Sequence, residues 1–299
     1  MDPKDIFSLV TLSVYTCPGD LMVLDLLKKY KTPGDLLIAL KYHEVDGLTR
    51  DLKRQTANLD TDIGYRVIQD CQINKIQYIC LGDKRYPEAL MSIPDPPLVI
   101  YCKGETEVLN FPDTAAIVGA RRATNYSLKA AREFSRSLAA SGITVVSGFA
   151  KGIDSCAHSA AIEAGGKTIA VLGCGILYDY PKDTKKFKKL LTENGAVISE
   201  YPPFAPAEQC FFRVRNRILS GLSKAVLVVQ AAKKSGSLNT VSHALEQGRE
   251  VFVIPPADLF CDEYQGQSAL LRDGANPAYS PEDIIKAVKG QMSDVSDQR

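Results

Sequence analysis

The feature that most limits the fold is a regular alternation, from Asp113 onward, of short apolar runs with stretches of helical periodicity. The apolar runs predict strands over residues 115–118, 144–146, 168–172, 196–199, 225–229 and 250–254. Helices are predicted over residues 127–140, 155–164, 183–193, 212–222 and 238–247. Strands that are apolar on both faces and separated by helices are typical of a parallel sheet covered on both sides. We therefore expect a doubly wound α/β domain with a Rossmann-like fold.

Residues 1–75 have a different pattern and are predicted to form a small all-helical N-terminal domain. Leucines recur there at three- and four-residue spacing, and Pro18-Gly19 and Pro33-Gly34 interrupt them. The pattern fits either a plain helical packing domain or a helix-hairpin-helix type module. Nothing in its charge balance marks this part as a binding domain.

A proline-rich bridge connects the two parts. Its Asp95-Pro96-Pro97 forces extended backbone and excludes helix, and a further strand is predicted over residues 98–102. The α/β domain is predicted to span residues 76–289, followed by a polar tail over 290–299.

Composition excludes several classes of protein. The net charge of +1 in 299 residues excludes a polycation, so any contact with nucleic acid must be a local patch. The eight cysteines are scattered without metal-ligand spacing, which indicates reduced core thiols rather than disulfides or a zinc site. No signal-peptide pattern or apolar run of membrane-spanning length is visible, so we expect a cytoplasmic protein without a membrane partner.

Cationic and glycine-containing loops follow three of the predicted strands. They are Gly119-Ala120-Arg121, the loop from Ser147 to Asp154 with Gly148, Lys151 and Gly152, and Lys234-Ser235-Gly236. Ligands of such sheets bind beyond the carboxyl ends of the strands, where helix N-termini favour anions. We expect Asp154 and Ser237 to cap the helices that follow their loops.

A fourth cationic segment, 209–223, contains Phe212, Arg213, Arg215, Asn216 and Arg217. Between residues 205 and 240 there are six Lys or Arg residues against one acidic residue. Guanidinium groups suit phosphate oxygens, and aromatic rings can stack on unpaired bases. The alternative is a solvated helix whose arginines pair with neighbouring carboxylates. Because four cationic segments exceed what one small phosphate needs, we expect a polyanion with many phosphates.

Machinery for catalysis is not visible. The dinucleotide-binding fingerprint is missing, since 172–175 offers only two glycines, and there is no Walker sequence. His158 and His243 each lie within a predicted helix, where a packing or surface role is the simpler interpretation. We expect no enzyme activity, no cofactor and no metal. The lysines of 185–189 form a basic helix face that is either solvated surface or an extension of the binding site.

Seven motifs, in order, resemble the DNA processing protein A (DprA/Smf) family. They are IVGARRAT, VVSGFAKGID, IAVLGCG followed by DYP, ISEYPP, RNRILSGLS, VLVVQAAKKSGSLNT and EQGREVFVIPP. The resemblance covers residue 86 to about residue 279. It implies an extended Rossmann-like fold and a homodimeric protein without enzyme activity. Such a protein would bind single-stranded DNA during natural transformation, protect it, and load the RecA recombinase onto it.

The resemblance also implies which residues bind DNA. At the first loop these are Gly119 and Arg121, with Ala120 replacing the family's serine. At the second loop Lys151 replaces an arginine, which keeps the charge but loses bidentate geometry. The full set implied is Gly119, Arg121, Ser147, Gly148, Lys151, Gly152, Phe212, Arg213, Arg215, Asn216, Arg217, Lys234, Ser235 and Gly236. The N-terminal helices match the sterile-alpha-motif-like module of some members only loosely.

The rival hypothesis is a nucleotide-processing enzyme on a related fold, such as a phosphoribohydrolase, or a sensor that binds a small nucleotide. Phosphoribohydrolases use a glycine-rich loop with a catalytic glutamate. At the corresponding place, residues 235–242 contain neither the glycine run nor the carboxylate. This difference favours binding over chemistry.

Overall fold

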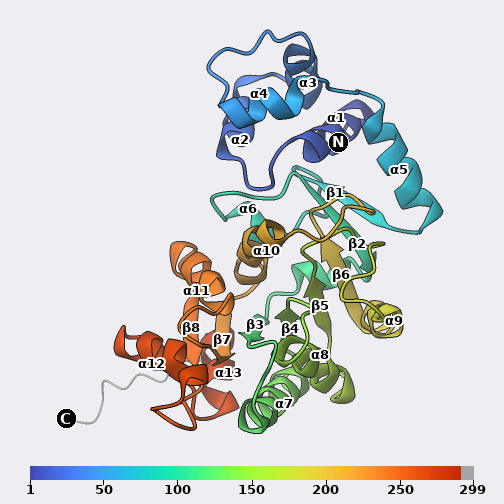
Figure 1. Ribbon diagram of the computed structural model, residues 1–299. Helices are drawn as coiled ribbons and strands as arrows, with labels where there is room; N and C mark the ends of the chain where they lie inside the picture. The colour runs from blue at the N-terminus through green and yellow to red at the C-terminus, as the bar shows by residue number, and fades with distance from the viewer. Residues whose placement is uncertain (291–299) are drawn as a thin grey trace.

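The computed structural model describes residues 1–290 and is built around one nine-stranded sheet (Figure 1). The strand order is β1-β2-β6-β5-β4-β3-β7-β8-β9. Strands β3 to β9 are parallel to one another, whereas β1 and β2 add an antiparallel edge beside β6. The strands are β1 (Gln77–Cys80), β2 (Val99–Gly104), β3 (Thr114–Gly119), β4 (Thr144–Ser147), β5 (Thr168–Val171), β6 (Gly195–Ser199), β7 (Ala225–Gln230), β8 (Glu250–Val253) and β9 (Asn276–Pro277).

The predicted α/β fold class is confirmed, and the predicted strands agree with the observed ones to within one or two residues. Strands β1 and β9 were not predicted because they are short edge strands. Only two residues form β9, and both are exposed.

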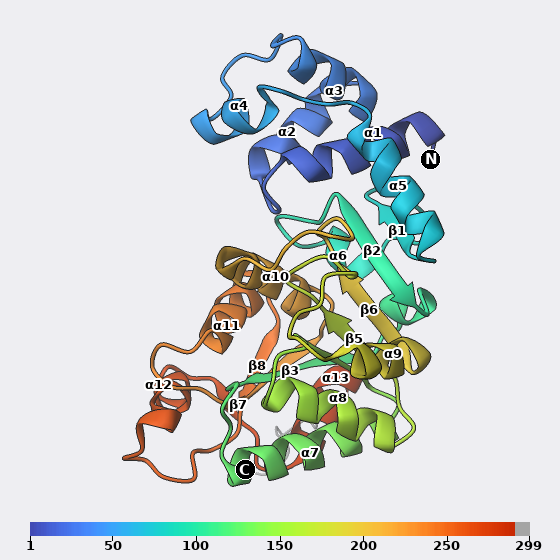
Figure 2. The same cartoon turned by 45° about the vertical axis from the view of Figure 1, so that its right-hand side comes forward.

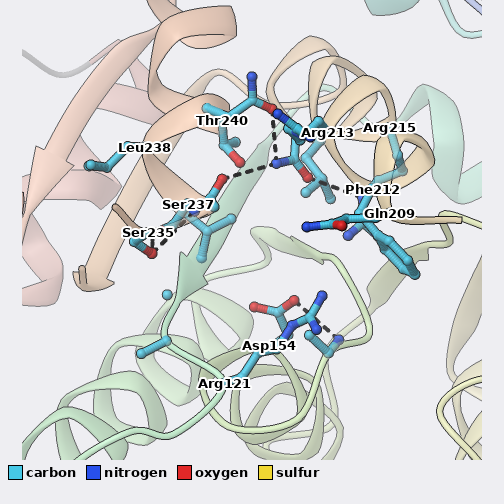
Figure 3. A pocket seen from close by; sticks show the side chains of 18 of the residues that line it. Arg121, Asp154, Gln209, Phe212, Arg213, Arg215, Ser235, Ser237, Leu238 and Thr240 are labelled. Atoms are coloured by element: carbon cyan, nitrogen blue, oxygen red, sulfur yellow. Dashed lines mark hydrogen bonds between the residues drawn. The ribbon is translucent and has the colours of Figure 1, made fainter. Parts of the chain in front are cut away.

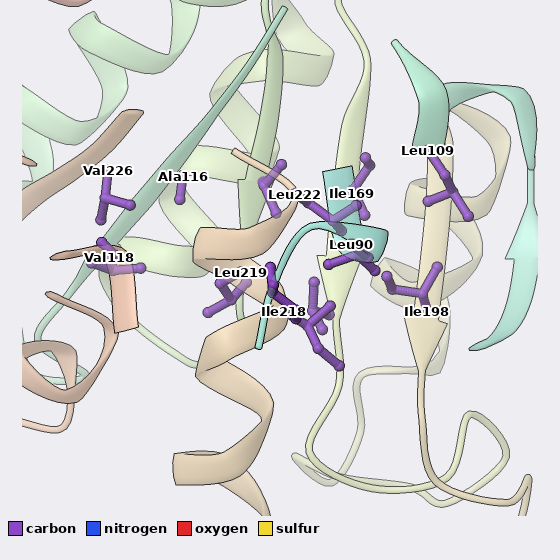
Figure 4. Packing of buried hydrophobic residues seen from close by; sticks show 14 of the residues in the cluster. Leu90, Leu109, Ala116, Val118, Ile169, Ile198, Ile218, Leu219, Leu222 and Val226 are labelled. Carbon is purple, nitrogen blue, oxygen red and sulfur yellow. The ribbon is translucent and has the colours of Figure 1, made fainter. Parts of the chain in front are cut away.

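Helices cover both faces of the sheet, and alternate residues of each strand face opposite layers. Ala115 and Ile117 of β3 pack against the layer of α7 (Asn125–Ala140), α8 (Ile153–Glu163) and α13 (Pro281–Lys289). Ala116 and Val118 face the opposite layer, which contains α6 (Glu88–Met91), α10 (Gln209–Gly221), α11 (Ser237–Glu246) and α12 (Gln265–Arg272). Figure 4 shows Ile218 and Leu219 of α10, and Leu222 directly after it, in the core of this second layer.

The helix ends have local causes in the sequence. Helix α7 begins two residues before the predicted start because the side chain of Thr124 accepts a hydrogen bond from the backbone N–H of Ser127. Gly142, Gly165 and Gly248, expected just after helices, adopt positive φ values of 77°, 74° and 66°. Their left-handed conformation confirms the predicted helix ends.

The predicted helical N-terminal segment contains α1 (Pro3–Tyr15), α2 (Leu21–Lys29), α3 (Pro33–Lys41), α4 (Arg50–Thr56) and α5 (Ile63–Ile73). Helices α1 and α5 pack on the edge of the sheet, where Val10 and Cys71 contact the cluster of Tyr101. Helices α2, α3 and α4 form a separate apolar cluster around Leu36. The division at residue 75 stays a prediction, and the predicted polar tail beyond Gly290 lies outside the described residues.

The structure also bears on membrane-spanning helices, metal sites and the cysteines. No helix in residues 1–290 combines the length and apolar character needed to cross a bilayer. Within the same residues, no group of three or more His, Cys, Asp or Glu side chains is arranged to hold a metal ion. Four cysteines are buried, but Cys17 and Cys210 are exposed, so not every cysteine is a core thiol as expected.

Candidate nucleic-acid interface

A partly open cleft of about 860 Å³ lies at the carboxyl ends of β3 and β7, between the loops that follow them and α10. Figure 3 shows Arg121 and Asp154 on one side of this cleft, with Arg213 and Ser237 across from them. The structure brings most of the predicted site residues to its walls: Gly119, Arg121, Phe212, Arg213, Arg215, Asn216, Lys234, Ser235 and Gly236. These residues come from three separate segments, which meet because the parallel strands all end at one edge of the sheet.

Positive charge dominates the lining. Five cationic side chains line the cleft: Arg121, Arg213, Arg215, Lys233 and Lys234. Asp154 is the one carboxylate among the lining residues. All of these cations except Arg215 are exposed to solvent. The arrangement favours an anionic ligand.

Phe212 lies in the middle of the cationic groups. The guanidinium carbons of Arg121 and Arg215 lie 5.6 Å and 5.9 Å from the centre of its ring. The ring of Tyr180 packs beside it with a centroid separation of 5.3 Å. A Cβ atom added at Gly173 would lie 2.7 Å from Cδ1 of Phe212, so a residue without a side chain is needed behind the ring. The surroundings therefore position an aromatic ring next to two guanidinium groups.

Arg215 is part of the wall of the cleft rather than a mobile surface cation. Its side chain is buried, and Nη1 donates hydrogen bonds to the carbonyl oxygens of Gly148, at 2.8 Å, and of Val171. A Cβ atom at Gly148 would lie 2.7 Å from Nη2 of Arg215. Gly148 thus makes room for the guanidinium that connects α10 to the sheet, and its predicted part in DNA binding stays a prediction.

Asp154 does not cap α8 as expected. The helix begins at Ile153 with Gly152 as its N-cap, and Asp154 is the second helical residue. Its Oδ2 accepts a hydrogen bond of 3.2 Å from the backbone N–H of Ala150. Burial raises the pKa of Asp154 to about 6, although the nearby Arg215 guanidinium acts in the opposite direction. The carboxyl group therefore fixes the backbone of its own loop, close to the charge of Arg215.

The remaining residues of the second loop lie away from the cleft lining. Ser147 is buried, and its hydroxyl donates a 2.6 Å hydrogen bond to the carbonyl oxygen of Ile117. Gly152 has a φ of 83°, and a Cβ atom there would lie 2.4 Å from the carbonyl oxygen of Ala120. Lys151 is exposed next to this contact. Ser147 and Gly152 therefore shape the loops rather than line the cleft.

The structure contradicts the expected phosphate contact of Arg217. Its side chain is 1% exposed, and Nη1 and Nη2 donate to the two carboxylate oxygens of Glu200 at 2.6 Å and 2.7 Å. Its Nε lies 3.0 Å from Oδ2 of Asp95. These two carboxylates hold the guanidinium in the core, and Arg217 is not among the lining residues of the cleft. Arg217 stabilises the fold.

The third loop is also organised differently from the prediction at one point. Gly236, not Ser237, is the N-cap of α11, and the hydroxyl groups of Ser235 and Ser237 lie 2.7 Å apart. Asn216 donates from Nδ2 to the carbonyl oxygen of Gly236 and to Oδ1 of Asn239, both at 3.3 Å. Asn216 therefore connects α10 to this loop.

Five further polar or aromatic residues line the cleft without having been in the predicted set: Tyr180, Gln209, Lys233, Asn239 and Thr240. The signal that could have found Tyr180 is the DYP motif itself. Gln209 opens the aromatic and arginine-rich segment, so its position on the first turn of α10 also indicated the cleft.

His158 lies in the core, where burial lowers its pKa to about 3. Its Nδ1 lies 2.6 Å from the hydroxyl oxygen of Thr168. The interpretation of His158 as a packed helix residue is confirmed.

The chain is similar to known proteins over most of its length. The family model described as DNA recombination-mediator protein A matches residues 77–289. The DNA processing protein DprA of Bacillus subtilis is 38% identical over 221 residues, which cover 74% of each chain. The Smf protein of Escherichia coli is 41% identical over 202 residues, which cover 67% of this chain and 54% of that protein.

Two solved structures are also similar. The X-ray structure of DprA from Streptococcus pneumoniae matches with a TM-score of 0.79 and 31% identity, over 95% of this chain and 97% of that one. A Helicobacter pylori DprA structure, described as giving insight into single-stranded DNA binding, matches with a TM-score of 0.64 and 31% identity, over 72% of this chain and 97% of that one. The sequence match and the shared architecture together show that the chain belongs to the DNA recombination-mediator protein A family, the DprA/Smf proteins.

Proposed function

We propose that the cleft binds single-stranded DNA. The observation that carries the proposal is the convergence of exposed cations from three segments around one half-buried aromatic ring, Phe212. Binding sites for single strands combine a positively charged groove with aromatic faces on which bases stack. The family membership and the single-stranded DNA named for the Helicobacter pylori relative support the same function.

Each part of the cleft has a distinct role in this proposal. Arg213 on α10 and Lys234 on the loop before α11 are exposed at the cleft and would contact phosphates. Arg121 would contact a phosphate while its guanidinium stays against the ring of Phe212. A base would stack on Phe212, and stacking of this kind contributes about 1–3 kcal/mol per base. Arg215 would contribute its charge from a fixed position in the wall.

Fluorescence anisotropy with a labelled oligothymidine tests the proposal. Arg213→Ala and Lys234→Ala should each weaken binding without changing the melting temperature, because both side chains are exposed. Lys53→Ala, an exposed lysine on the remote helix α4, is the matched control and should bind normally. Wild-type affinity in both cleft variants would contradict a role for this cleft.

A small nucleotide is the second candidate ligand, and two observations favour it. The volume of the cleft, about 860 Å³, falls within the roughly 300–1,000 Å³ of ordinary ligand pockets. Asp154 is a carboxyl group of raised pKa beside a cleft, which is a common property of catalytic groups. Thermal shift separates the candidates, since a nucleotide-binding enzyme or sensor would be stabilised by nucleoside monophosphates and a strand-binding protein by long oligothymidine.

We further propose that the protein acts without chemistry, protects incoming DNA and loads RecA onto it in natural transformation, as a homodimer. Family membership supports this finer assignment. Light scattering of the purified chain measures the dimer. RecA assembly on DNA coated with single-strand binding protein measures loading, and it should become faster when this protein is added.

A further inference from the structure

A second groove lies beside the first cleft, across the layer formed by α7, α8 and α9 (Lys185–Glu193). Figure 2 shows these three helices next to one another. The groove has a volume of about 670 Å³, and its lining combines polar, cationic and aromatic side chains: Leu128, Lys129, Arg132, Gly152, Ser155, Cys156, Ser159 and Phe187. None of these residues except Gly152 belongs to the predicted DNA-binding set.

Only a thin backbone wall separates the groove from the cleft. Ala120 and Ala150 line the cleft, whereas Gly152 and Ser155 line the groove. The two loops touch at this wall, where the backbone N–H of Ile153 donates to the carbonyl oxygen of Ala120 at 3.2 Å. Arg121 and Lys151 are exposed on these same loops. A polyanion that crosses the wall would therefore meet positive charge along its path.

Two cations, Lys129 and Arg132, line the groove, and two more lie next to Phe187 in the sequence. Lys129 and Arg132 are exposed on α7, and Lys185 and Lys186 are exposed on α9, directly before Phe187. Arg132 is paired with Glu163 at 2.8 Å. Among the residues that the structure describes, no carboxylate oxygen lies within 4.0 Å of the ammonium groups of the other three. The groove therefore retains cations for an anionic partner.

Two other lysines of α9 have partners within the protein. Lys188 donates to the carbonyl oxygens of Ile176 and Tyr178, both at 3.0 Å, and it is half-buried. Lys189 lies 3.7 Å from Glu193. The basic face noted in the sequence thus divides into these two and the exposed pair, Lys185 and Lys186.

Phe187 gives the groove an aromatic element. Its ring stacks on the buried Phe149 with a centroid separation of 5.7 Å and an interplanar angle of 12°. The ring of His158 meets it edge-on at 6.4 Å. The ring is therefore fixed from one side while it remains half-exposed at the groove. The groove thus combines a fixed aromatic ring with the exposed Lys129, as the cleft combines Phe212 with exposed cations.

We propose that the DNA strand bound in the cleft continues over Arg121 and Lys151 into this second groove. Bases would stack at Phe187, and Lys129, Lys185 and Lys186 would contact phosphates. The inference rests on the proposed function, because it extends the same ligand beyond the first site. It predicts a binding site longer than the cleft alone.

Binding of a short and a long oligothymidine, of about six and about twenty nucleotides, tests the inference. The groove variants are the double variant Lys129→Glu/Lys186→Glu, and Phe187→Leu, which keeps apolar contact with Phe149. Each variant should weaken binding of the long oligonucleotide by about fivefold or more, and the loss of one stacked base in Phe187→Leu corresponds to about fivefold. The affinity for the short oligonucleotide should stay within about twofold of wild type. The control Lys4→Glu/Lys53→Glu makes the same change in net charge on exposed lysines of α1 and α4 and should alter neither affinity.

The outcomes separate the inference from the proposed function. Arg213→Ala, in the first cleft, should weaken both lengths. If Arg213→Ala weakens binding but the groove variants bind the long oligonucleotide with wild-type affinity, the first cleft binds DNA and the second groove does not. If the wild-type protein binds neither length, the proposed function and the inference both fail. Equal losses for both lengths in the groove variants would also overturn the inference, since the groove would then not extend the site.

Discussion

Replacement of Arg217 by methionine tests whether this arginine stabilises the fold or binds DNA. In the structure, Arg217 forms a bidentate ion pair with Glu200, whose side chain is 3% exposed, and a further pair with Asp95. Removal of one partner of a buried ion pair leaves an uncompensated charge and destabilises a protein by about 3–5 kcal/mol. Arg217→Met should therefore strongly lower the free energy of unfolding.

The expected size of the effect is large enough to measure by thermal unfolding. For a domain of about 150–250 residues, 1 kcal/mol corresponds to roughly 2–4 °C, so the melting temperature should fall by about 6–20 °C. The double variant Arg217→Met/Glu200→Leu should recover part of this loss, because the buried carboxylate is removed together with its partner. At a temperature where Arg217→Met is folded, its affinity for single-stranded DNA should stay close to wild type.

Arg213→Ala is the matched comparison on the same helix, because its side chain is exposed and lines the cleft. It should lose DNA affinity and keep its melting temperature. The reasoning is refuted if Arg217→Met unfolds like wild type and loses DNA binding as Arg213→Ala does. That result would return Arg217 to the phosphate-binding set that the sequence predicted.

Two further predictions concern the walls of the cleft. Gly173→Ala should displace the ring of Phe212, because the new Cβ would lie 2.7 Å from Cδ1 of that ring. DNA affinity should therefore fall while the circular dichroism spectrum remains native. Unchanged affinity would show that the position of the ring does not matter for binding. The pKa of Asp154 is raised in the folded state from 3.8 to about 6, so the stability this group contributes is present below about pH 4 and is lost as the pH rises to about 6. Asp154→Asn lacks this titration, and its stability relative to wild type, measured by urea unfolding, should rise between about pH 4 and pH 6; a constant difference would contradict the raised pKa.

The parallel sheet and the convergence of loops could be predicted because both follow from local patterns. Apolar runs separated by helices predict parallel strands, and parallel strands bring the loops after Val118 and Val229 to one edge. Phe212 and Arg213 could be placed in the site because they begin the helix that faces this edge. The short strands β1 and β9 could not be found, since edge strands of two to four residues carry little periodic signal.

The partners of the buried arginines could not be predicted because they are distant in the sequence. Arg217 pairs with Asp95, which lies 122 residues earlier, and Arg215 donates to Gly148, which lies 67 residues earlier. Arg213 and Arg217 are four residues apart and so lie on neighbouring positions of the helix surface, which gives no sign that one is exposed and the other buried. The sequence predicts the helix, but the burial of Arg217 depends on the position of Glu200 in the fold.

The salt dependence of single-stranded DNA binding tests the central claim most directly. Each neutralised phosphate of a single strand contributes a slope of about 0.7 in log affinity against log salt concentration. The exposed cations of the cleft, Arg121, Arg213, Lys233 and Lys234, thus predict that affinity falls with salt at a slope of at least about 2–3. Arg213→Ala should reduce this slope by about 0.7. Binding that is independent of salt, or a slope unchanged in Arg213→Ala, would contradict the account.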